Sequence, residues 1–374
     1  SSLGSNGRQA ASFFVDGVYV SGSVSSLAFS DIERIEVLKG PQSVLFGRAT
    51  FAGAVNFVTK DPSNEFEGFL SATYAQFDEH EIVGAVSGPI IQDRLFFRLG
   101  ARSFGYEGEY VNDLINPETE LGGQTTWSVS GSLLATPTDN FRAKLNVTYS
   151  QDDDDLAATQ LQNGDCFDRG IALFNTVCGE AELDEDGFGL NTSYLEEPGL
   201  QRELWRSSLR LDWDVPQHTI TSITAYNHED STRQFDVDFE PAIIFFGSIN
   251  GFFDFPVDED GAQVADIQNY RDFSQEIRIS SDFDGPFQYL LGGYYLDLTS
   301  SGGRDDGIKS FNPDSRREET NWAVFGSLSY DISSRLHATL EGRYQEAELK
   351  KTYAEKYITG KKEITWATTP SLFL

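Results

Sequence analysis

Apolar and polar residues alternate along most of the chain from about residue 65 onward. In residues 141–150 the odd-numbered positions are apolar or aromatic, while the even-numbered positions are Arg, Lys, Asn, Thr and Ser. Since successive side chains of a β-strand point to opposite faces, this pattern gives one apolar and one polar face. The same alternation covers 126–135, 205–213 and 336–345, so the sequence predicts a sheet of two-faced strands.

Two kinds of connection separate these predicted strands. Short connections carry the Pro, Gly, Asp, Asn or Ser residues that turns require, and lie near 91–94, 136–140, 215–218, 282–286 and 331–334. Long and mostly acidic connections lie at 109–121, 152–200, 233–268, 301–318 and 351–362. Because the two kinds alternate strictly, we expect one end of the sheet to be tight and the other elaborate.

The strands fit a membrane β-barrel better than a soluble β-sandwich, although both folds alternate in this way. We expect roughly ten to sixteen residues per strand, more than the usual five or six. Trp205 and Trp213 close the two ends of one apolar set, as the aromatic girdles of a membrane barrel do. Polar faces with Arg or Lys beside Ser and Thr suit a wet lumen. No window approaches the ~18 consecutive apolar residues of a membrane helix.

Composition narrows the function classes. The chain has 374 residues and a net charge of -31, and a field of that sign repels phosphate backbones, which excludes nucleic acid as a partner. Aromatic residues make up 13%, too many for a disordered chain and typical of strands. The sequence contains no Met, even at position 1, so we expect a mature product or a fragment.

Cys166 and Cys178 are the two cysteines, and they lie in a stretch rich in Asp, Gly and Asn. In an oxidising compartment this pair predicts a disulfide that staples a loop. The alternative is a metal site, which needs further ligands at close spacing. It is not favoured, because none of the four histidines lies near either cysteine in sequence.

The sequence also holds fragments of calcium-binding motifs, but no catalytic motif that stands out. Parts of a calcium loop occur at Asp184, Asp186 and Gly187 and again at Asp258, Asp260 and Gly261, but neither completes the twelve-residue pattern. Divalent cations that bridge acidic loops to lipopolysaccharide phosphates are an alternative reading of these charges. No Ser/His/Asp, Cys/His or paired-carboxylate constellation stands out, so we expect a protein that is not an enzyme and has no cofactor.

The first sixty residues form a separate small unit. They contain Asp-Ile-Glu-Arg-Ile-Glu-Val-Leu-Lys-Gly-Pro-Gln-Ser-Val-Leu-Phe-Gly-Arg at 31–48 and Gly-Ala-Val-Asn-Phe-Val-Thr-Lys at 53–60. Over about residues 12–62 this stretch resembles the second half of the plug domain of TonB-dependent outer-membrane receptors. The remainder resembles the barrel of that family in its rhythm.

The resemblance implies an all-β transmembrane antiparallel barrel with a partial N-terminal α+β plug. We count about twelve of the family's 22 strands, and expect the C-terminal half of the plug at 1–62 and the N-terminal part of the barrel at 63–374. It further implies a multi-pass protein of the bacterial outer membrane, in contact with lipid and lipopolysaccharide. An open barrel leaves an unpaired edge, so this piece alone is not expected to insert stably.

The resemblance also suggests sites. Plug charges are predicted to pair with lumen-facing barrel charges in a polar latch, and ordinary solvation of the lumen is the competing reading. The plug members are Glu33, Arg34, Glu36, Lys39 and Arg48, and the barrel members are Arg98, Arg102, Arg142, Arg210, Arg278, Glu341 and Arg343. Ligand-facing candidates at the plug apex are Tyr19, Ser23, Ser25, Ser26 and Phe29.

The expected function is TonB-dependent import of a scarce nutrient, most often a ferric siderophore in this family, with TonB and its inner-membrane complex as partners. Cobalamin, haem or an oligosaccharide are alternative substrates. A passive porin shares the barrel but lacks the plug, so residues 12–62 argue against it. A surface β-rich binding protein that transports nothing is the remaining alternative, and it is not expected to carry apolar bands ~25 Å tall flanked by aromatic residues.

Overall fold

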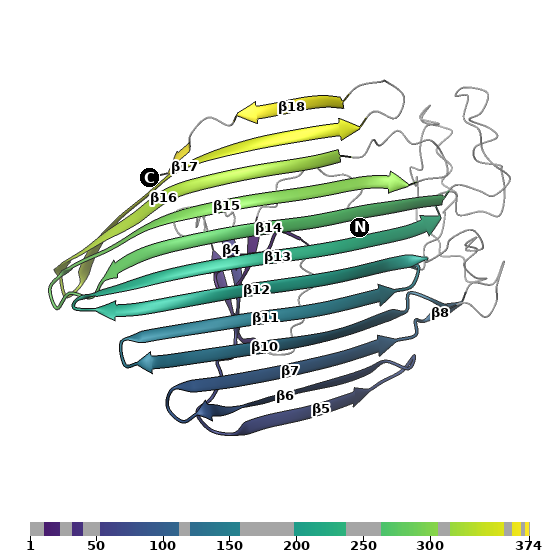
Figure 1. The fold of residues 1–374 in the computed structure, drawn as a ribbon, viewed down its shortest axis with the longest axis horizontal. Coiled ribbons are helices and arrows are strands. Elements are labelled where there is room, and N and C mark those ends of the chain that lie inside the picture. The colour runs from purple at the N-terminus through teal and green to yellow at the C-terminus, as the bar shows by residue number, and fades with distance from the viewer. Residues whose placement is uncertain are drawn as a thin grey trace.

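The computed structural model describes residues 11–22, 32–39, 53–111, 120–157, 198–236, 263–305, 315–354, 361–367 and 371–373. These residues form a large antiparallel sheet, a four-stranded sheet and a two-stranded ribbon (Figure 1). No helix among them is long and apolar enough to cross a membrane.

The large sheet follows chain order from one edge to the other. Its strands are β5 (Glu67–Tyr74), β6 (His80–Ile91), β7 (Leu95–Tyr106), β10 (Gln124–Thr138), β11 (Phe141–Asp154), β12 (Gly199–Val215), β13 (His218–Asp236), β14 (Gln263–Ser281), β15 (Phe287–Asp305), β16 (Ser315–Ser333), β17 (Leu336–Ala354), β18 (Lys361–Ala367) and β19 (Ser371–Phe373). The last two pair with successive stretches of β17 and therefore share one position in the sheet. The predicted count of about twelve strands is confirmed.

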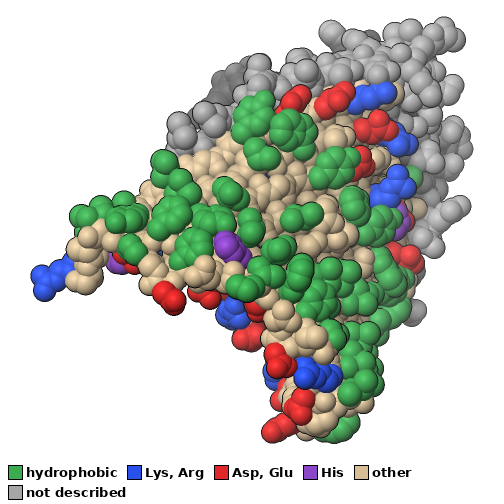
Figure 2. Space-filling model, turned by 60° about the vertical axis from the view of Figure 1, so that its left-hand side comes forward, with side chains coloured by type: hydrophobic (Ala, Val, Ile, Leu, Met, Phe, Trp, Pro, Cys, Tyr) green, Lys and Arg blue, Asp and Glu red, His purple; other side chains and the backbone are tan. Residues whose placement is uncertain are grey.

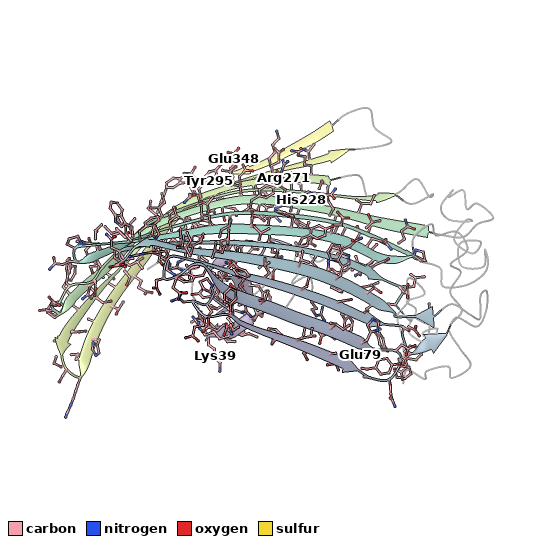
Figure 3. The ribbon with its side chains drawn as sticks, turned by 60° about the horizontal axis from the view of Figure 1, so that its bottom comes forward. Lys39, Glu79, His228, Arg271, Tyr295 and Glu348 are labelled. Atoms are coloured by element: carbon pink, nitrogen blue, oxygen red, sulfur yellow. The ribbon has the colours of Figure 1, made fainter. Side chains whose placement is uncertain are left out.

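The large sheet is curved, and it arches over the four-stranded sheet (Figure 3). The smaller sheet lies on the concave side, behind the large sheet in the view of Figure 1. Within the described chain, β5 and β18 are the two edges of the large sheet and do not pair with each other. The arrangement is an open part of a barrel wall with the N-terminal unit in its lumen.

Burial on the two faces is the reverse of a soluble protein. Trp205, Leu209 and Trp213 lie on the convex face with exposed fractions of 43%, 37% and 49%. On the concave face Lys144, Asp152 and other polar side chains are buried. Figure 2 shows hydrophobic side chains gathered over the outer surface. An apolar exterior around a polar interior is stable only in contact with lipid, so the predicted membrane barrel is confirmed.

The aromatic girdle is also present. Eight residues separate Trp205 from Trp213, which at ~3.3 Å per residue is about 26 Å along the strand, close to the ~25 Å apolar band of membrane barrels. Trp205 stacks at a tilt on Tyr149, and Tyr149 on Trp127, with ring centroids 6.2 and 5.2 Å apart. These three rings mark the edge of the band on the side of the long connections.

All five predicted short connections join neighbouring strands at the same end, here called the tight-turn end (Figure 1). The predicted strict alternation of short and long connections is wrong at one place. The connection from β5 to β6 lies at the opposite, long-loop end but consists of only five residues, 75–79. This compact turn holds Phe77 and Asp78 at φ values of 59° and 48°. A small ribbon of β8 (Tyr110–Val111) and β9 (Glu120–Leu121) lies in the next connection at the long-loop end, between β7 and β10.

Several strands are longer than predicted. Strands β13 to β17 have 19 residues each, against the expected maximum near sixteen. The additional residues lie at the long-loop end, where 227–236 is mostly polar on both faces. Hydrophobic alternation marks only the part of a strand that faces lipid, whereas the backbone ladder continues beyond it.

The four-stranded sheet is the plug unit. It consists of β1 (Ala11–Val15), β2 (Val18–Tyr19), β3 (Ile32–Lys39) and β4 (Gly53–Thr59), in the order β2-β1-β4-β3. Val15–Val20 is not one continuous strand, because Asp16 and Gly17 have φ values of 50° and 82° and turn the chain back on itself. An Asp-Gly pair with both φ values positive makes the two-residue hairpin turn that suits twisted strands.

Candidate functional site at the plug and barrel interface

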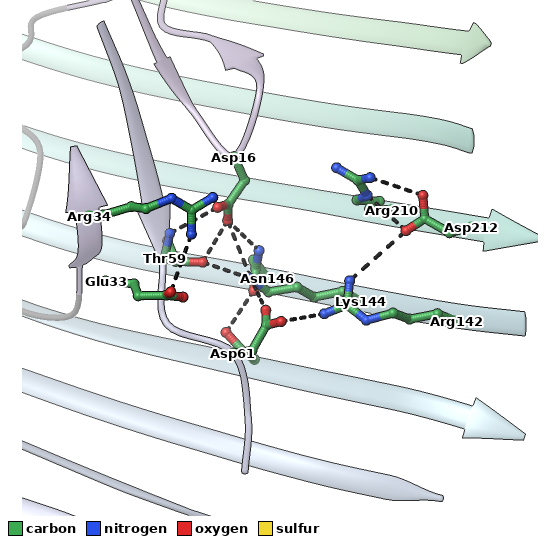
Figure 4. Close-up of polar contacts among 11 residues, drawn as sticks. Asp16, Glu33, Arg34, Thr59, Asp61, Arg142, Lys144, Asn146, Arg210 and Asp212 are labelled. Carbon is green, nitrogen blue, oxygen red and sulfur yellow. Dashed lines mark hydrogen bonds and ion pairs between the residues drawn. The ribbon is translucent and has the colours of Figure 1, made fainter. Parts of the chain in front are cut away.

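Asp16, at the tip of the first plug hairpin, reaches the barrel wall (Figure 4). Its carboxylate accepts hydrogen bonds from the Thr59 amide at 2.9 Å, the Thr59 hydroxyl at 2.6 Å and Asn146 Nδ2 at 2.9 Å. Lys144 Nζ lies 3.7 Å from the same carboxylate. The turn therefore places one acidic side chain against strand β11 while it is also tied to β4.

Asp61 adds a second carboxylate at this place. It accepts from Arg142 and lies 2.9 Å from Lys144 Nζ, and Lys144 also donates to the Thr59 hydroxyl at 2.9 Å. The Lys144 side chain is only 7% exposed, so the buried cation is shared by two plug carboxylates. We call this group the tight-turn contact; it comprises Asp16, Thr59, Asp61, Arg142, Lys144 and Asn146.

A second contact joins plug and barrel nearer the long-loop end. Ser21 donates to Asp272, which also accepts from Asn227 Nδ2 at 2.9 Å. A Cβ atom added at Gly22 would lie 2.0 Å from Glu229 Oε2, so the plug backbone approaches this buried carboxylate closely. We call this group the loop-end contact; it comprises Ser21, Gly22, Asn227, Glu229 and Asp272.

A cavity of about 430 Å³ lies between the plug and the barrel wall. Charged side chains line it from both sides. Those of the plug are Asp16, Glu33, Arg34, Glu36 and Asp61, and those of the barrel are Arg142, Lys144, Arg210, Glu276, Arg278 and Arg343. The site is therefore a polar interface that holds charged groups of both signs.

The predicted plug members of the latch lie mainly on β3. Arg34 contacts Glu36 at 2.8 Å and Glu33 at 3.2 Å, so its ion pairs among the described residues stay within its own strand. A hydrogen bond from Asn56 Nδ2, at 3.0 Å, lowers the pKa of Glu36, and Arg34 lowers it further. Lys39 lies exposed at the end of β3, and Arg48 lies outside the described residues.

The predicted barrel arginines divide into two groups. Arg142, Arg210, Arg278 and Arg343 line the cavity, whereas Arg98 and Arg102 pair with Glu67 and Glu81 at 3.7 and 2.6 Å, away from it. Glu341 lies exposed on β17 toward the tight turns.

Sequence reasoning missed the plug residues of the tight-turn contact. An Asp-Gly pair between apolar runs was the available signal for Asp16. Nothing local distinguishes Asp61 from other loop acids.

The apex candidates and the cysteines are only partly described. Tyr19 lines the cavity, and its ring meets that of Phe14 edge to face at 5.9 Å. Ser23, Ser25, Ser26 and Phe29 lie outside the described residues, as do Cys166, Cys178 and the acidic calcium-like segments. Within the described part of the chain, no group of three or more His, Cys, Asp or Glu residues is placed to hold a metal ion.

Known proteins share this architecture. The solved structure of the ferric yersiniabactin uptake receptor FyuA from Yersinia pestis superposes with a TM-score of 0.72 at 16% identity, covering 97% of this chain and 52% of that one. The siderophore receptor PiuA from Acinetobacter baumannii gives 0.71 at 14%, covering 97% and 53%. The chain thus spans about half the length of these structures.

Sequence comparison agrees. The pesticin receptor of Yersinia enterocolitica is 32% identical over 117 residues, which cover 30% of this chain and 17% of the receptor. The TonB-dependent receptor plug domain model matches residues 2–54, and the TonB-dependent receptor-like β-barrel model matches residues 132–374. Since the barrel model matches more than half of the chain, the protein belongs to the TonB-dependent receptors, a family of outer-membrane transporters and receptors rather than enzymes.

Proposed function

We propose that the protein imports a ferric siderophore across the bacterial outer membrane, with energy supplied by TonB and its inner-membrane complex. The observation that carries this proposal is the plug sheet in the lumen, bound to the wall through side-chain hydrogen bonds and ion pairs. Such contacts exchange readily with water, so a pulling force can separate them without breaking an apolar core. Relatives described as siderophore receptors support the choice of substrate.

The tight-turn contact acts as the polar latch of this transporter. Asp16 and Asp61 hold the plug to strand β11 through the buried Lys144. Glu33, Arg34, Glu36, Lys39 and Arg48 are proposed as further plug members, and four of the predicted barrel arginines face the first three across the cavity. Movement of the plug would bring these two charged surfaces into new pairs.

Substrate capture is proposed at the plug apex, by Tyr19, Ser23, Ser25, Ser26 and Phe29. Support comes from the loop-end contact, since Ser21 and Gly22 connect Tyr19 to this segment and touch buried barrel carboxylates. A ligand that displaces the apex would therefore also displace Ser21. Cys166 and Cys178 are proposed to form a disulfide that constrains the long connection after β11.

We also propose contact with lipid and lipopolysaccharide, which the character of the surface supports. The apolar convex face meets the acyl chains, and charged side chains such as Arg271, which shares a rung with His228 and Trp205, stand near the girdle (Figure 3). Those side chains stand at the height of the lipid headgroups.

The test is nutrient growth of a strain that lacks the gene encoding this chain, with and without the restored gene. The panel comprises ferric siderophores, haem, cobalamin and oligosaccharides at limiting concentration, each supplied to cells with and without TonB. We expect growth on one ferric siderophore to require both the gene and TonB. Dependence on a different nutrient would replace the substrate, and growth that never depends on the gene would contradict import.

A further inference from the structure

Two neighbouring rungs of the barrel wall concentrate basic side chains on the lumenal face. The first rung runs from Arg142 through Asp212, Thr221, Arg278, Gly292 and Phe325 to Arg343. The second runs from Lys144 through Arg210, Ile223, Glu276, Tyr294 and Ala323 to Gln345. We call the five cations of these two rungs, Arg142, Lys144, Arg210, Arg278 and Arg343, the basic belt.

The basic belt is a local excess in a strongly acidic protein. Its five cations stand with two carboxylates, Asp212 and Glu276, so the two rungs carry a net charge of +3. Over the same strands, β11 to β17, the next rung toward the long loops contains Asn146, Ser208, Ser274 and Asn321 and is uncharged. The chain as a whole carries -31, so the excess is not a reflection of composition.

The plug surface opposite has the complementary charge. The charged plug residues that line the cavity are four carboxylates and one guanidinium, a net charge of -3. Two of these carboxylates, Asp16 and Asp61, already lie on Lys144. In this arrangement the plug supplies the anions that the basic belt requires.

Withdrawal of the plug changes this balance. Asp212 and Glu276 still contact Arg210 and Arg278, at 2.8 and 3.4 Å, but the carboxylates of the plug leave with it. Uncompensated cations that stand close together repel one another, so an anion that enters the space lowers the free energy of the open state. The cavity of about 430 Å³ already falls within the size range of small-molecule sites.

We infer that the basic belt is a transit site for an anionic metal chelate, which replaces the plug carboxylates Asp16 and Asp61 as the plug withdraws. This inference rests on the proposed import function and assigns its substrate a class: a ferric chelate with net negative charge. Because the chelate takes the place of the plug carboxylates, the positive charge of the basic belt stays balanced while the plug withdraws. A neutral chelate offers no such replacement and passes more slowly.

The test removes belt charge without removing a contact to the plug. Arg210 and Arg278 have their ion pairs with wall carboxylates, so the double variant Arg210→Gln/Arg278→Gln leaves the tight-turn contact in place. TonB-dependent uptake of radioactive iron is measured from an anionic ferric tris-catecholate and from a neutral ferric tris-hydroxamate. Surface binding of each chelate is measured separately in de-energised cells.

We expect wild-type cells to favour the anionic chelate, and the double variant to lose about tenfold of that uptake with surface binding unchanged. Uptake of the neutral chelate should change little, and Arg210→Lys/Arg278→Lys should retain transport. The matched control is Arg271→Gln/Arg316→Gln, which removes two arginines from the convex face and should behave as wild type. Equal loss for both chelates, or no loss, would overturn the inference.

A second measurement does not require transport. In the purified receptor, the urea concentration at which trypsin cleaves the plug is compared in citrate and in chloride at equal ionic strength. Because a ligand that binds only the open state favours it, citrate should lower this midpoint in wild type relative to the double variant. An identical response of the two proteins would contradict the basic belt even if import is confirmed. If wild type imports neither chelate while citrate acts as expected, the proposed function fails instead.

Discussion

The tight-turn contact and the loop-end contact have opposite polarity. At the tight-turn contact the plug supplies carboxylates and the wall supplies Arg142 and Lys144. At the loop-end contact the wall supplies the buried carboxylates Glu229 and Asp272, while the plug supplies a hydroxyl and a glycine. The first is held by ion pairs, and the second by close packing and a hydrogen bond from a neutral hydroxyl donor to a carboxylate.

The difference in polarity explains how a plug can be both anchored and removable. At the tight-turn end the side chains of the Arg142–Asp61 pair are 34% and 49% exposed, so this pair weakens with ionic strength and re-forms with other partners. The loop-end contact depends on the fit of a short backbone segment, which a bound ligand is placed to disturb. Ligand binding and the pulling force would then act on different kinds of interaction, and the two can be separated by mutation.

The largest expected effect comes from Lys144→Ala. The substitution leaves Asp16 and Asp61 without their shared buried cation, and breaking such a pair costs about 3 kcal/mol of plug stability. The measurement is the urea midpoint for trypsin cleavage of the plug in the purified receptor. Lys144→Arg, which preserves the charge, is the control and should lose less. Equal losses would show that packing rather than charge determines the contact.

A smaller effect is expected from Asp16→Asn. Asparagine tolerates the positive φ of the turn and keeps hydrogen-bonding capacity, so only the charge is lost, at about 1 kcal/mol. Asp16→Ala removes the turn preference as well and should destabilise the plug further. Thermal unfolding of both variants checks this order, and the Asp16→Asn loss should shrink at high salt. A loss that does not depend on salt would contradict an ionic role for Asp16.

At the loop-end contact, Ser21→Ala should cost about 1 kcal/mol or less, because Asp272 keeps its bond from Asn227. Unlike the Asp16→Asn effect, this loss should be the same at low and high salt, since the removed donor is neutral. The same urea assay at two salt concentrations measures it. A salt-dependent loss would indicate that the two contacts do not differ in the way proposed.

The sequence predicts structure where the role of a residue follows from its neighbours along the chain. Alternation around Trp205 and Trp213 predicted the wall, and the Asp-Gly pair at Asp16 carried a hairpin signal that the apolar run around it concealed. Asp61 and Arg142 are 81 residues apart, and their pairing depends on where the plug lies in the lumen. Local pattern holds no information of that kind, which is why sequence reasoning did not single out Asp61.

The smallest effect should come from Glu36. It lies on β3, which lines the cavity, and its ion pair is with Arg34 of the same strand. Its pKa is lowered by Asn56 and Arg34, so its ionised form adds stability above the usual carboxyl range near ~4. As pH falls through the lowered pKa, that contribution is lost, and Glu36→Gln should remove this part of the acid sensitivity. Plug cleavage midpoints at neutral and acidic pH test the sign. If the contribution of Glu36 to plug stability instead grows on acidification, this carboxylate lies beside an anion. That result would contradict its pairing with Arg34 and would weaken the charge balance assigned to the plug surface.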